Sequence, residues 1–256
     1  MEILDAPIPA AAVEARLDAL AARHRQAGNA GVELLNLIGA QAEGLLDRLP
    51  PALRDRLGER TDAALRAAMA AAHRSRGVVA DSPGWLSRAV ITAMGGVGGM
   101  GGLPTALVEL PLTVTVLLRA IQDVAVENGF DPAEPGVQYD CVEVLAAAGP
   151  LAHDDGAELG FIGARVTVTG AALNALIARV APRLAAVLGQ KLAAQTVPVL
   201  GAAAGALTNY VYTGYYQQMA QVHFGLRRLA IEADLPHDEV LDAFRRRVAG
   251  PPAAER

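Results

Sequence analysis

Few side chains in the apolar parts of this chain can do acid or base chemistry, and Glu109 is the most informative of them. It is the single charged residue in the thirty residues Ala89–Leu118. In a membrane an isolated carboxylate is costly and marks a functional or buried polar contact. In a soluble bundle, a glutamate near a helix start is favourably placed against the helix dipole. We favour the second interpretation and retain Glu109 as a candidate binding residue.

Five further polar or aromatic residues are candidate binding residues. Arg119 and Asp123 are four positions apart, so they can pair on one helix face. Asn209 lies within an apolar segment, where it is either an interhelical hydrogen-bonding group or the cap of a bent helix. Tyr210 follows it directly. Trp85, the single tryptophan, suits either a membrane interface or a half-buried core position.

The histidines and acids do not form a recognisable metal or catalytic motif. His153, Asp154 and Asp155 are adjacent, and three consecutive side chains on regular structure cannot all face one ion, so we interpret them as the acidic start of a helix. His223 is interpreted as a core or interface histidine. Because there is no nucleophile elbow and no zinc motif, we predict no catalytic residue, no metal and no cofactor. A hydrolase is the least supported alternative.

Glycine pairs four residues apart predict close helix packing in both apolar segments. On a helix this spacing leaves a groove that admits a second backbone, as in membrane helix pairs, whereas in a loop the glycines would provide flexibility. The text GVGGMG also matches a dinucleotide-binding motif. The preceding WLSRAVITAM has a helical pattern and no strand rhythm appears, so nucleotide binding is not expected. The pairs are Gly95 and Gly99, Gly98 and Gly102, and Gly201 and Gly205.

Composition favours a bundle with small core side chains. Hydrophobic residues make up 52% of the 256 residues but aromatic residues only 4%, so alanine, leucine, valine and glycine supply the apolar mass. The net charge of −5, with basic residues spread along the chain, argues against nucleic acid as a partner. Cys141 is the single cysteine, which excludes an intrachain disulfide. The first residues lack the pattern of a signal peptide, so we expect the bulk of the chain on the cytoplasmic side.

Apolar spacing predicts helices along the chain and no strands. The first, amphipathic helix is expected to end at Gly28 and Asn29, and Pro111 and Pro182 are expected to kink and to break the helices that contain them. The predicted fold is all-α, a multi-helix bundle. The helices are expected at about 9–27, 31–49, 51–74, 104–128, 137–148, 159–181 and 237–248, with a further, bent helix within 192–226.

Two apolar segments are expected to form the centre of this bundle. Besides Ala89–Leu118, the segment Leu192–Leu226 has no Asp, Glu, Lys or Arg. We predict that the two segments pack on each other as a hairpin. Four tyrosines at the end of the second segment form either a belt at a membrane interface or a buried seam between helices. They are Tyr210, Tyr212, Tyr215 and Tyr216.

Three regions are predicted. Residues 1–76 form a charged, solvent-facing helical arm, residues 77–236 a helical core, and residues 237–256 a last helix with a basic tail that suits anionic lipid.

Several runs in the core resemble the EcsC family of bacterial proteins. They are GGVGGMGGLPTALVELPLTVTVLLRAIQDVAVENGFDP, YDCVEVLA, VPVLGAAAGALTNY and AQVHFGLRRL, in that order between Gly77 and Asp234. The family is named for a protein encoded beside an ABC transporter. The resemblance therefore implies an accessory role near a transport or export system, and a hydrolase component has been suggested for the family. It implies no catalytic residue.

The sequence thus predicts a helical, membrane-associated accessory protein, peripheral or amphitropic on the cytoplasmic side of the inner membrane. Ala, Gly and Thr make the two apolar segments poorer bilayer residues than Leu or Ile, which favours docking over a permanent span. The expected partners are membrane lipid or an apolar ligand, a membrane transporter, and a second copy of the chain. The alternative is a soluble helical module that binds a lipid or other apolar ligand.

Overall fold

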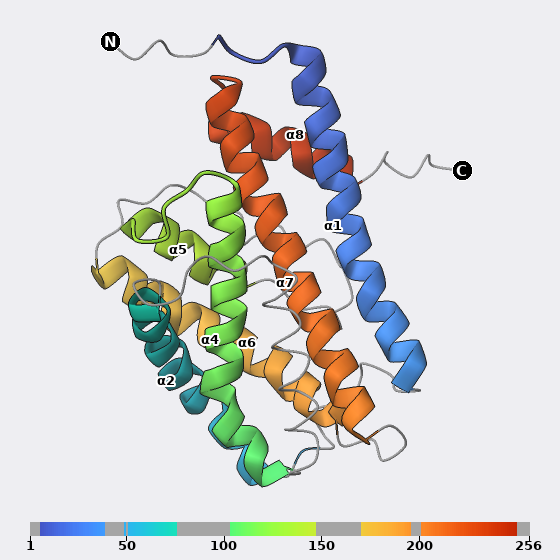
Figure 1. Ribbon diagram of the computed structural model, residues 1–256, viewed down its shortest axis with the longest axis vertical. Helices are drawn as coiled ribbons and strands as arrows, with labels where there is room; N and C mark the ends of the chain where they lie inside the picture. The colour runs from blue at the N-terminus through green and yellow to red at the C-terminus, as the bar shows by residue number, and fades with distance from the viewer. Residues whose placement is uncertain are drawn as a thin grey trace.

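The described part of the chain is a bundle of helices. The computed structural model describes residues 6–38, 49, 51–75, 103–146, 170–195 and 201–249, and every regular element within them is an α-helix (Figure 1). This confirms the predicted all-α class. The helices are α1 (Ala10–Ile38), α2 (Pro51–Ser75), α4 (Leu103–Glu127), α5 (Pro135–Val144), α6 (Gly170–Gln195), α7 (Gly201–Glu232) and α8 (His237–Ala249).

Helix α7 is the central element of the bundle. It contacts α1, α4, α5, α6 and α8, and its contact with α1 is the most extensive in the described structure (Figure 1). On the other side of α4, helices α2 and α6 pack on each other and on α4. From Tyr212 to Leu229 most side chains of α7 are buried on every side of the helix, as expected for a helix enclosed by neighbours.

The first two helices belong to the same hydrophobic core as the rest. Leu17 and Ala21 of α1 are each 1% exposed, and Leu65 and Ala68 of α2 are fully buried. Helix α1 runs antiparallel to α7, because Ile8 N donates to Glu232 O and Arg23 bonds Gln218. The predicted division at residue 76 stays untested, but α1 and α2 are not solvent-facing on all sides. One face of each carries charge and the other packs on the bundle.

Two predicted helix breaks are wrong. Helix α1 continues through Gly28 and Asn29 to Ile38, and α6 continues through Pro182. A single glycine inside a helix costs only about 1 kcal/mol, and the burial of Ala27 and of residues before it can outweigh that cost. Pro182 lies on the exposed face of α6 while Val180 and Leu184 on either side are fully buried, so packing maintains the helix across the proline.

The two apolar segments meet in part as predicted. Helices α4 and α7 contact each other side by side, but α5 and α6 lie between them in the chain. They also run in the same direction (Figure 1), so they are not a hairpin of consecutive helices. Gly95, Gly98, Gly99 and Gly102 lie outside the described residues, and Gly201 and Gly205 lie in the first turns of α7, where side-chain contacts are not described.

Three of the four clustered tyrosines form a buried seam. Tyr212, Tyr215 and Tyr216 are at most 2% exposed, whereas Tyr210 is 50% exposed. The Tyr212 hydroxyl donates to the Val187 carbonyl of α6 at 3.5 Å. Tyr215 and Tyr216 meet edge to face with ring centroids 5.4 Å apart. For these three tyrosines the prediction of a buried seam between helices is therefore correct, and the alternative of a belt at a membrane interface is wrong.

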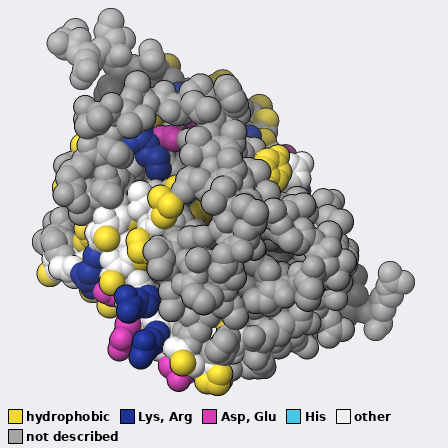
Figure 2. Space-filling model, turned by 60° about the horizontal axis from the view of Figure 1, so that its bottom comes forward, with side chains coloured by type: hydrophobic (Ala, Val, Ile, Leu, Met, Phe, Trp, Pro, Cys, Tyr) yellow, Lys and Arg dark blue, Asp and Glu magenta, His cyan; other side chains and the backbone are white. Residues whose placement is uncertain are grey.

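The last helix closes the bundle over α1 and α7. Asp238 and Glu239 lie in its first turn and Arg246 and Arg247 in its last, which complements the helix dipole. Arg247 forms ion pairs with Glu14 and Asp18 of α1. On the face shown in Figure 2, the described basic and acidic side chains likewise lie next to one another, with apolar side chains between them.

Candidate functional site

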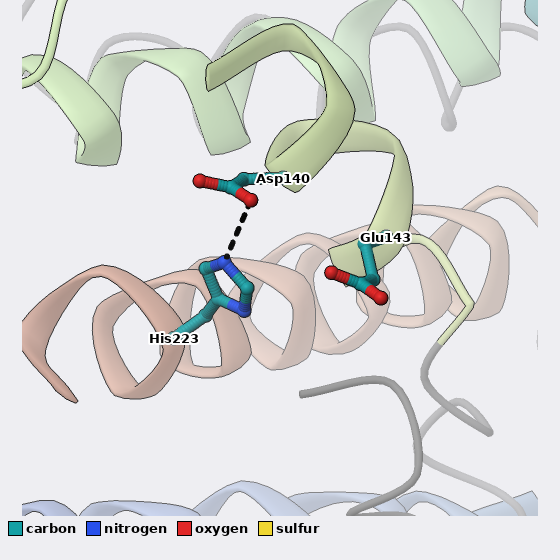
Figure 3. A group of neighbouring side chains, drawn as sticks. All are labelled: Asp140, Glu143 and His223. Atoms are coloured by element: carbon teal, nitrogen blue, oxygen red, sulfur yellow. Dashed lines mark ion pairs between the residues drawn. The ribbon is translucent and has the colours of Figure 1, made fainter. Parts of the chain in front are cut away.

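A cluster of two carboxyl groups and one imidazole lies where α5 crosses α7. Asp140 and Glu143 come from α5 and His223 from α7 (Figure 3). One ligand atom from each of the three lies within 4.8 Å of the others. Asp140 and Glu143 are three positions apart, so they share one face of α5. This is the group of metal-ligating side chains that the described part of the structure brings together.

The loop before α5 sets its position. Helix α4 ends at Asn128 and Gly129, where Gly129 has φ +83° and Phe130 N donates back to Ala125 O at 2.9 Å. Asn128 Nδ2 also donates to Gln221 of α7 at 3.2 Å. Pro135 then opens α5, and proline suits this first position because its missing N–H would have no partner there. The loop is thus tied to α7 within one turn of His223.

Asp140 lies between an imidazole and a guanidinium group of α7. His223 Nε2 is 3.6 Å from its Oδ1, and Arg227 bonds its other oxygen, Oδ2. The Arg227 guanidinium also stacks on the Phe130 ring, with its Cζ 4.4 Å from the ring centroid. Phe224 packs against both Phe130 and His223, at centroid distances of 5.6 and 5.2 Å. The aromatic rings fix the directions of Arg227 and His223 toward Asp140.

Glu143 is more deeply buried and has weaker partners. Its side chain is 6% exposed, and its nearest cation is Arg179 Nη2 of α6 at 4.0 Å, the limit of an ion pair. Within the described chain no hydrogen bond to this carboxyl group is present. Figure 3 shows the carboxyl group directed toward the His223 ring. A buried carboxylate without a close partner is costly, so Glu143 is the more weakly compensated of the two acids.

The surroundings of Asp140 and Glu143 shift their pKa values in opposite directions. Burial and, to a smaller extent, the negative charge of Asp140 raise the pKa of Glu143 to about 7, against the lowering effects of His223 and Arg179. Burial also acts to raise the pKa of Asp140, but His223 and Arg227 together outweigh it and hold this pKa below its usual value. Near neutral pH the cluster therefore combines an ionised aspartate with a glutamate close to its titration midpoint.

The residues predicted from the sequence lie elsewhere. Arg119 and Asp123 do form the predicted ion pair on α4, at 3.2 Å, and both are largely buried. Tyr210 is exposed on α7. Glu109 and Asn209 lie on α4 and α7 in stretches whose side chains are not described, and Trp85, His153, Asp154 and Asp155 lie outside the described residues. A binding role for any of them stays a prediction.

Sequence reasoning did not identify Asp140, Glu143 and Arg227, and it interpreted His223 as a core histidine. The burial of His223, 4% exposed, agrees with that interpretation, but its acidic neighbours were not foreseen. The available signs were the spacing of Asp140 and Glu143 within YDCVEVLA and of His223 and Arg227 within AQVHFGLRRL, each on one helix face. What joins the two runs, eighty residues apart, is the crossing of α5 over α7.

The fold and the site define an all-α bundle with a carboxyl–imidazole cluster at the crossing of α5 and α7. The family model for the EcsC protein family matches residues 80–229, which is more than half of the chain and includes the three residues of the cluster and Arg227. The chain therefore belongs to the EcsC family, which confirms the resemblance. Comparisons with curated proteins and with solved structures gave no match.

Proposed function

We propose that this protein is a membrane-associated accessory protein of the EcsC type that docks on the cytoplasmic leaflet through helix α6. The observation that carries the proposal is the composition and exposure of this helix. Of the described helices, α6 has the one window long and apolar enough to cross a membrane, Ala171–Gly189, with a mean hydropathy of 1.5. Only 44% of that window is buried within the protein.

A core helix of a soluble bundle would pass the same length and hydropathy test. The exposed residues of the window therefore distinguish membrane docking from simple burial. Ala171, Ala175, Ala178, Pro182 and Ala186 are exposed, as is Asn174, which accepts a hydrogen bond from Arg66 of α2. The opposite face, with Leu176, Ile177, Val180 and Leu184, is buried against the bundle. The outer face of α6 is thus smooth and mainly apolar, which suits shallow docking at the headgroup level more than a transmembrane span.

Two arginines on the same outer surface select the kind of lipid. Arg179 and Arg183 are exposed on α6, and no acid of α6 accompanies them. A helix that lies in the interface plane extends such side chains to the headgroups while its apolar atoms face the acyl chains. Each basic side chain near an anionic surface contributes about 1 kcal/mol. Anionic lipid is the expected target.

Flotation with liposomes tests the proposal. Protein without tags is expected to float with vesicles of phosphatidylglycerol and phosphatidylethanolamine, and not with vesicles of phosphatidylcholine alone. Arg183→Glu on α6 is expected to abolish flotation, whereas Arg60→Glu, the same charge change at an exposed position of α2, is expected to leave most of it. Equal flotation of both variants, or none by the unmodified protein, would contradict docking through α6.

The proposed partner in the membrane is a transport system, as the family name implies. Cross-linking in membranes followed by identification of the linked proteins tests it, and the expected product joins α6 or its neighbours to a transporter subunit. The alternative, a soluble module with an apolar ligand, stays a prediction, because no observation on the described residues favours it. Native mass spectrometry of the purified protein would reveal such a ligand.

A further inference from the structure

We propose that Asp140, Glu143 and His223 form a binding site for one divalent transition-metal ion, with Zn²⁺ as the reference ion. The proposal rests on the geometry of the cluster and is independent of membrane docking. Each residue offers one ligand atom, and the three atoms lie within 4.8 Å of one another at the crossing of two helices (Figure 3). Two of the three residues are buried, Glu143 at 5% and His223 at 4% exposed, while the Asp140 side chain is 18% exposed.

The donor set selects the class of ion. Imidazole nitrogen suits Zn²⁺ and other borderline metals, whereas Mg²⁺ and Ca²⁺ prefer oxygen ligands alone. One imidazole with two carboxylates is therefore a site for Zn²⁺ or a neighbouring transition metal. Three protein ligands leave a fourth position of a tetrahedral site for water or another small oxygen ligand.

Charge balance gives the second reason. The carboxyl groups of Asp140 and Glu143 lie within 4.8 Å of each other, and the one arginine paired with Glu143 among the described residues is Arg179 at 4.0 Å, with 61% of its side chain exposed to solvent. A divalent ion between the carboxylates would neutralise both charges at short range. It would also give Glu143 the strong partner that its buried position lacks.

The arginines do not close the site. Arg227 bonds Oδ2 of Asp140, whereas the other oxygen, Oδ1, faces His223 Nε2 at 3.6 Å. An ion held by Asp140 and His223 would bind Oδ1, so Arg227 does not compete with it for the same oxygen. Ligating carboxylates are commonly held in this way by an outer hydrogen bond. Arg179 is largely exposed, and its long side chain can turn to solvent when an ion binds Glu143.

The distance between donor atoms is close to what an ion requires. Ligands of a tetrahedral Zn²⁺ lie about 3.4 Å apart, since each is about 2.0–2.2 Å from the metal. His223 Nε2 and Asp140 Oδ1 are already 3.6 Å apart. Glu143 has to approach by no more than about 1.5 Å, which rotation about its side-chain bonds allows.

Isothermal titration of tag-free protein, first stripped with a chelator, tests the site. ZnCl₂ is expected to bind at one ion per chain, and MgCl₂ is expected not to compete at equal concentration. His223→Gln and Glu143→Gln are each expected to weaken Zn²⁺ binding by at least about tenfold. Circular dichroism and thermal melting of each variant without metal show whether it folds.

Two matched variants serve as controls. His24 is buried to the same extent as His223, 4% exposed, and also meets a phenylalanine edge to face, Phe244 at 5.9 Å. His24→Gln therefore imposes a similar change away from the cluster and is expected to bind Zn²⁺ as the unmodified protein does. Asp123→Asn is the matching control for a carboxylate, since Asp123 is largely buried and paired with an arginine, and this variant is also expected to bind Zn²⁺ normally. A third variant, His153→Gln, tests whether the ion binds instead at the adjacent residues His153, Asp154 and Asp155.

Absence of saturable Zn²⁺ binding would overturn the proposal. So would loss of binding in His153→Gln with binding retained in His223→Gln, which would place the ion elsewhere. If the His223 and Glu143 variants do not fold, Co²⁺ added to the unmodified protein decides the question. Visible absorption bands of tetrahedral Co²⁺, displaced by one equivalent of Zn²⁺, would support the site, and octahedral bands like those of the aqueous ion would contradict it.

Discussion

Asp140 and Glu143 are one helical turn apart on α5, yet the pKa values of their carboxyl groups are shifted in opposite directions. Asp140 is bonded to Arg227 and faces His223, and these two groups hold its pKa below the usual value despite burial. Glu143 meets only a distant arginine, so burial dominates and its pKa rises to about 7. The difference comes mainly from the partners that α7 and α6 supply, because burial acts to raise the pKa of both acids.

The raised pKa of Glu143 predicts a specific dependence of stability on pH. Since the folded state holds the proton more tightly, the contribution of Glu143 to the free energy of unfolding is highest below its ordinary pKa of 4.5 and falls as the pH rises through about 7, by at most about 3 kcal/mol. Glu143→Gln is expected to remove this fall. Urea unfolding at several pH values, with chelator present, measures it.

Glu127→Gln, a change of the same kind at an exposed glutamate of α4, is the control for this measurement and is expected to keep the fall. Asp140 contributes in the opposite sense, because its lowered pKa gives stability that is present above about 3.8 and lost on further acidification. Identical pH profiles of the unmodified protein and Glu143→Gln would contradict the assignment.

Arg227 is expected to matter more for stability than the exposed arginines do. Arg227→Ala removes both the bond to Asp140 and the stacking on Phe130, and it leaves a partly buried carboxylate without its main partner, so a loss of about 2–3 kcal/mol is expected. Arg16→Ala breaks a more exposed pair with Glu232 and should cost less than about 1 kcal/mol. Chemical denaturation of the two variants measures both losses of unfolding free energy. Equal losses would contradict the larger contribution of the Arg227–Asp140 pair.

Two glycines of α7 differ in how closely neighbouring helices pack against them. At Gly225 an added Cβ would lie 2.8 Å from Leu20 Cδ2 of α1, so the missing side chain is part of the α1–α7 contact. At Gly214, on the same helix, an added Cβ would meet nothing within 4 Å. An added side chain would therefore meet a close neighbour, the end of the Leu20 side chain, at the first position only, although both glycines lie inside a helix.

This difference predicts opposite outcomes for the same substitution. Gly214→Ala is expected to stabilise the protein by up to about 1 kcal/mol, because alanine loses less backbone entropy in a helix. Gly225→Ala is expected to lose that gain or to destabilise, since Leu20 must move. In a Leu20→Ala background, Gly225→Ala should become favourable. Thermal and urea unfolding test the pairs, and a stabilising Gly225→Ala in the unmodified background would contradict the close contact.

The whole molecule is held together across the limits of the family match. The matched region, residues 80–229, excludes α1, α2 and α8, yet α1 makes the most extensive contact with α7, and α2 packs on α4 and α6. Leu17 of α1 is 1% exposed and Leu118 of α4 fully buried, in the same hydrophobic cluster. The N-terminal helices are therefore expected to unfold together with the rest.

Three leucine substitutions test this expectation. Leu17→Ala in α1 and Leu118→Ala in α4 are each expected to destabilise the protein by about 2–5 kcal/mol, since both side chains are buried. Leu112→Ala is expected to have a small effect, because Leu112 is 47% exposed. Unfolding followed by circular dichroism should show one shared transition. A negligible effect of Leu17→Ala would mean that α1 is a separate arm.

The sequence by itself determined the helical class, the family and most helix positions. Amphipathic spacing is local, and the helix over His237–Ala249 lies within a residue of its predicted limits. It also correctly predicted the Arg119–Asp123 pair, because four residues on a helix bring two side chains together whatever surrounds them. It was wrong at Gly28 and Pro182, where burial of neighbouring side chains outweighs local helix-breaking preference.

Only the tertiary structure decided which chemistry-bearing side chains meet. Glu143 and His223 are eighty residues apart, and neither is distinctive in its own segment. Their contact depends on the angle at which α5 leaves the loop at Gly129 and crosses α7, and on the depth of that crossing. Spacing within one helix specifies a face, but the partner of that face, and the burial that shifts a pKa there, arise from packing between helices.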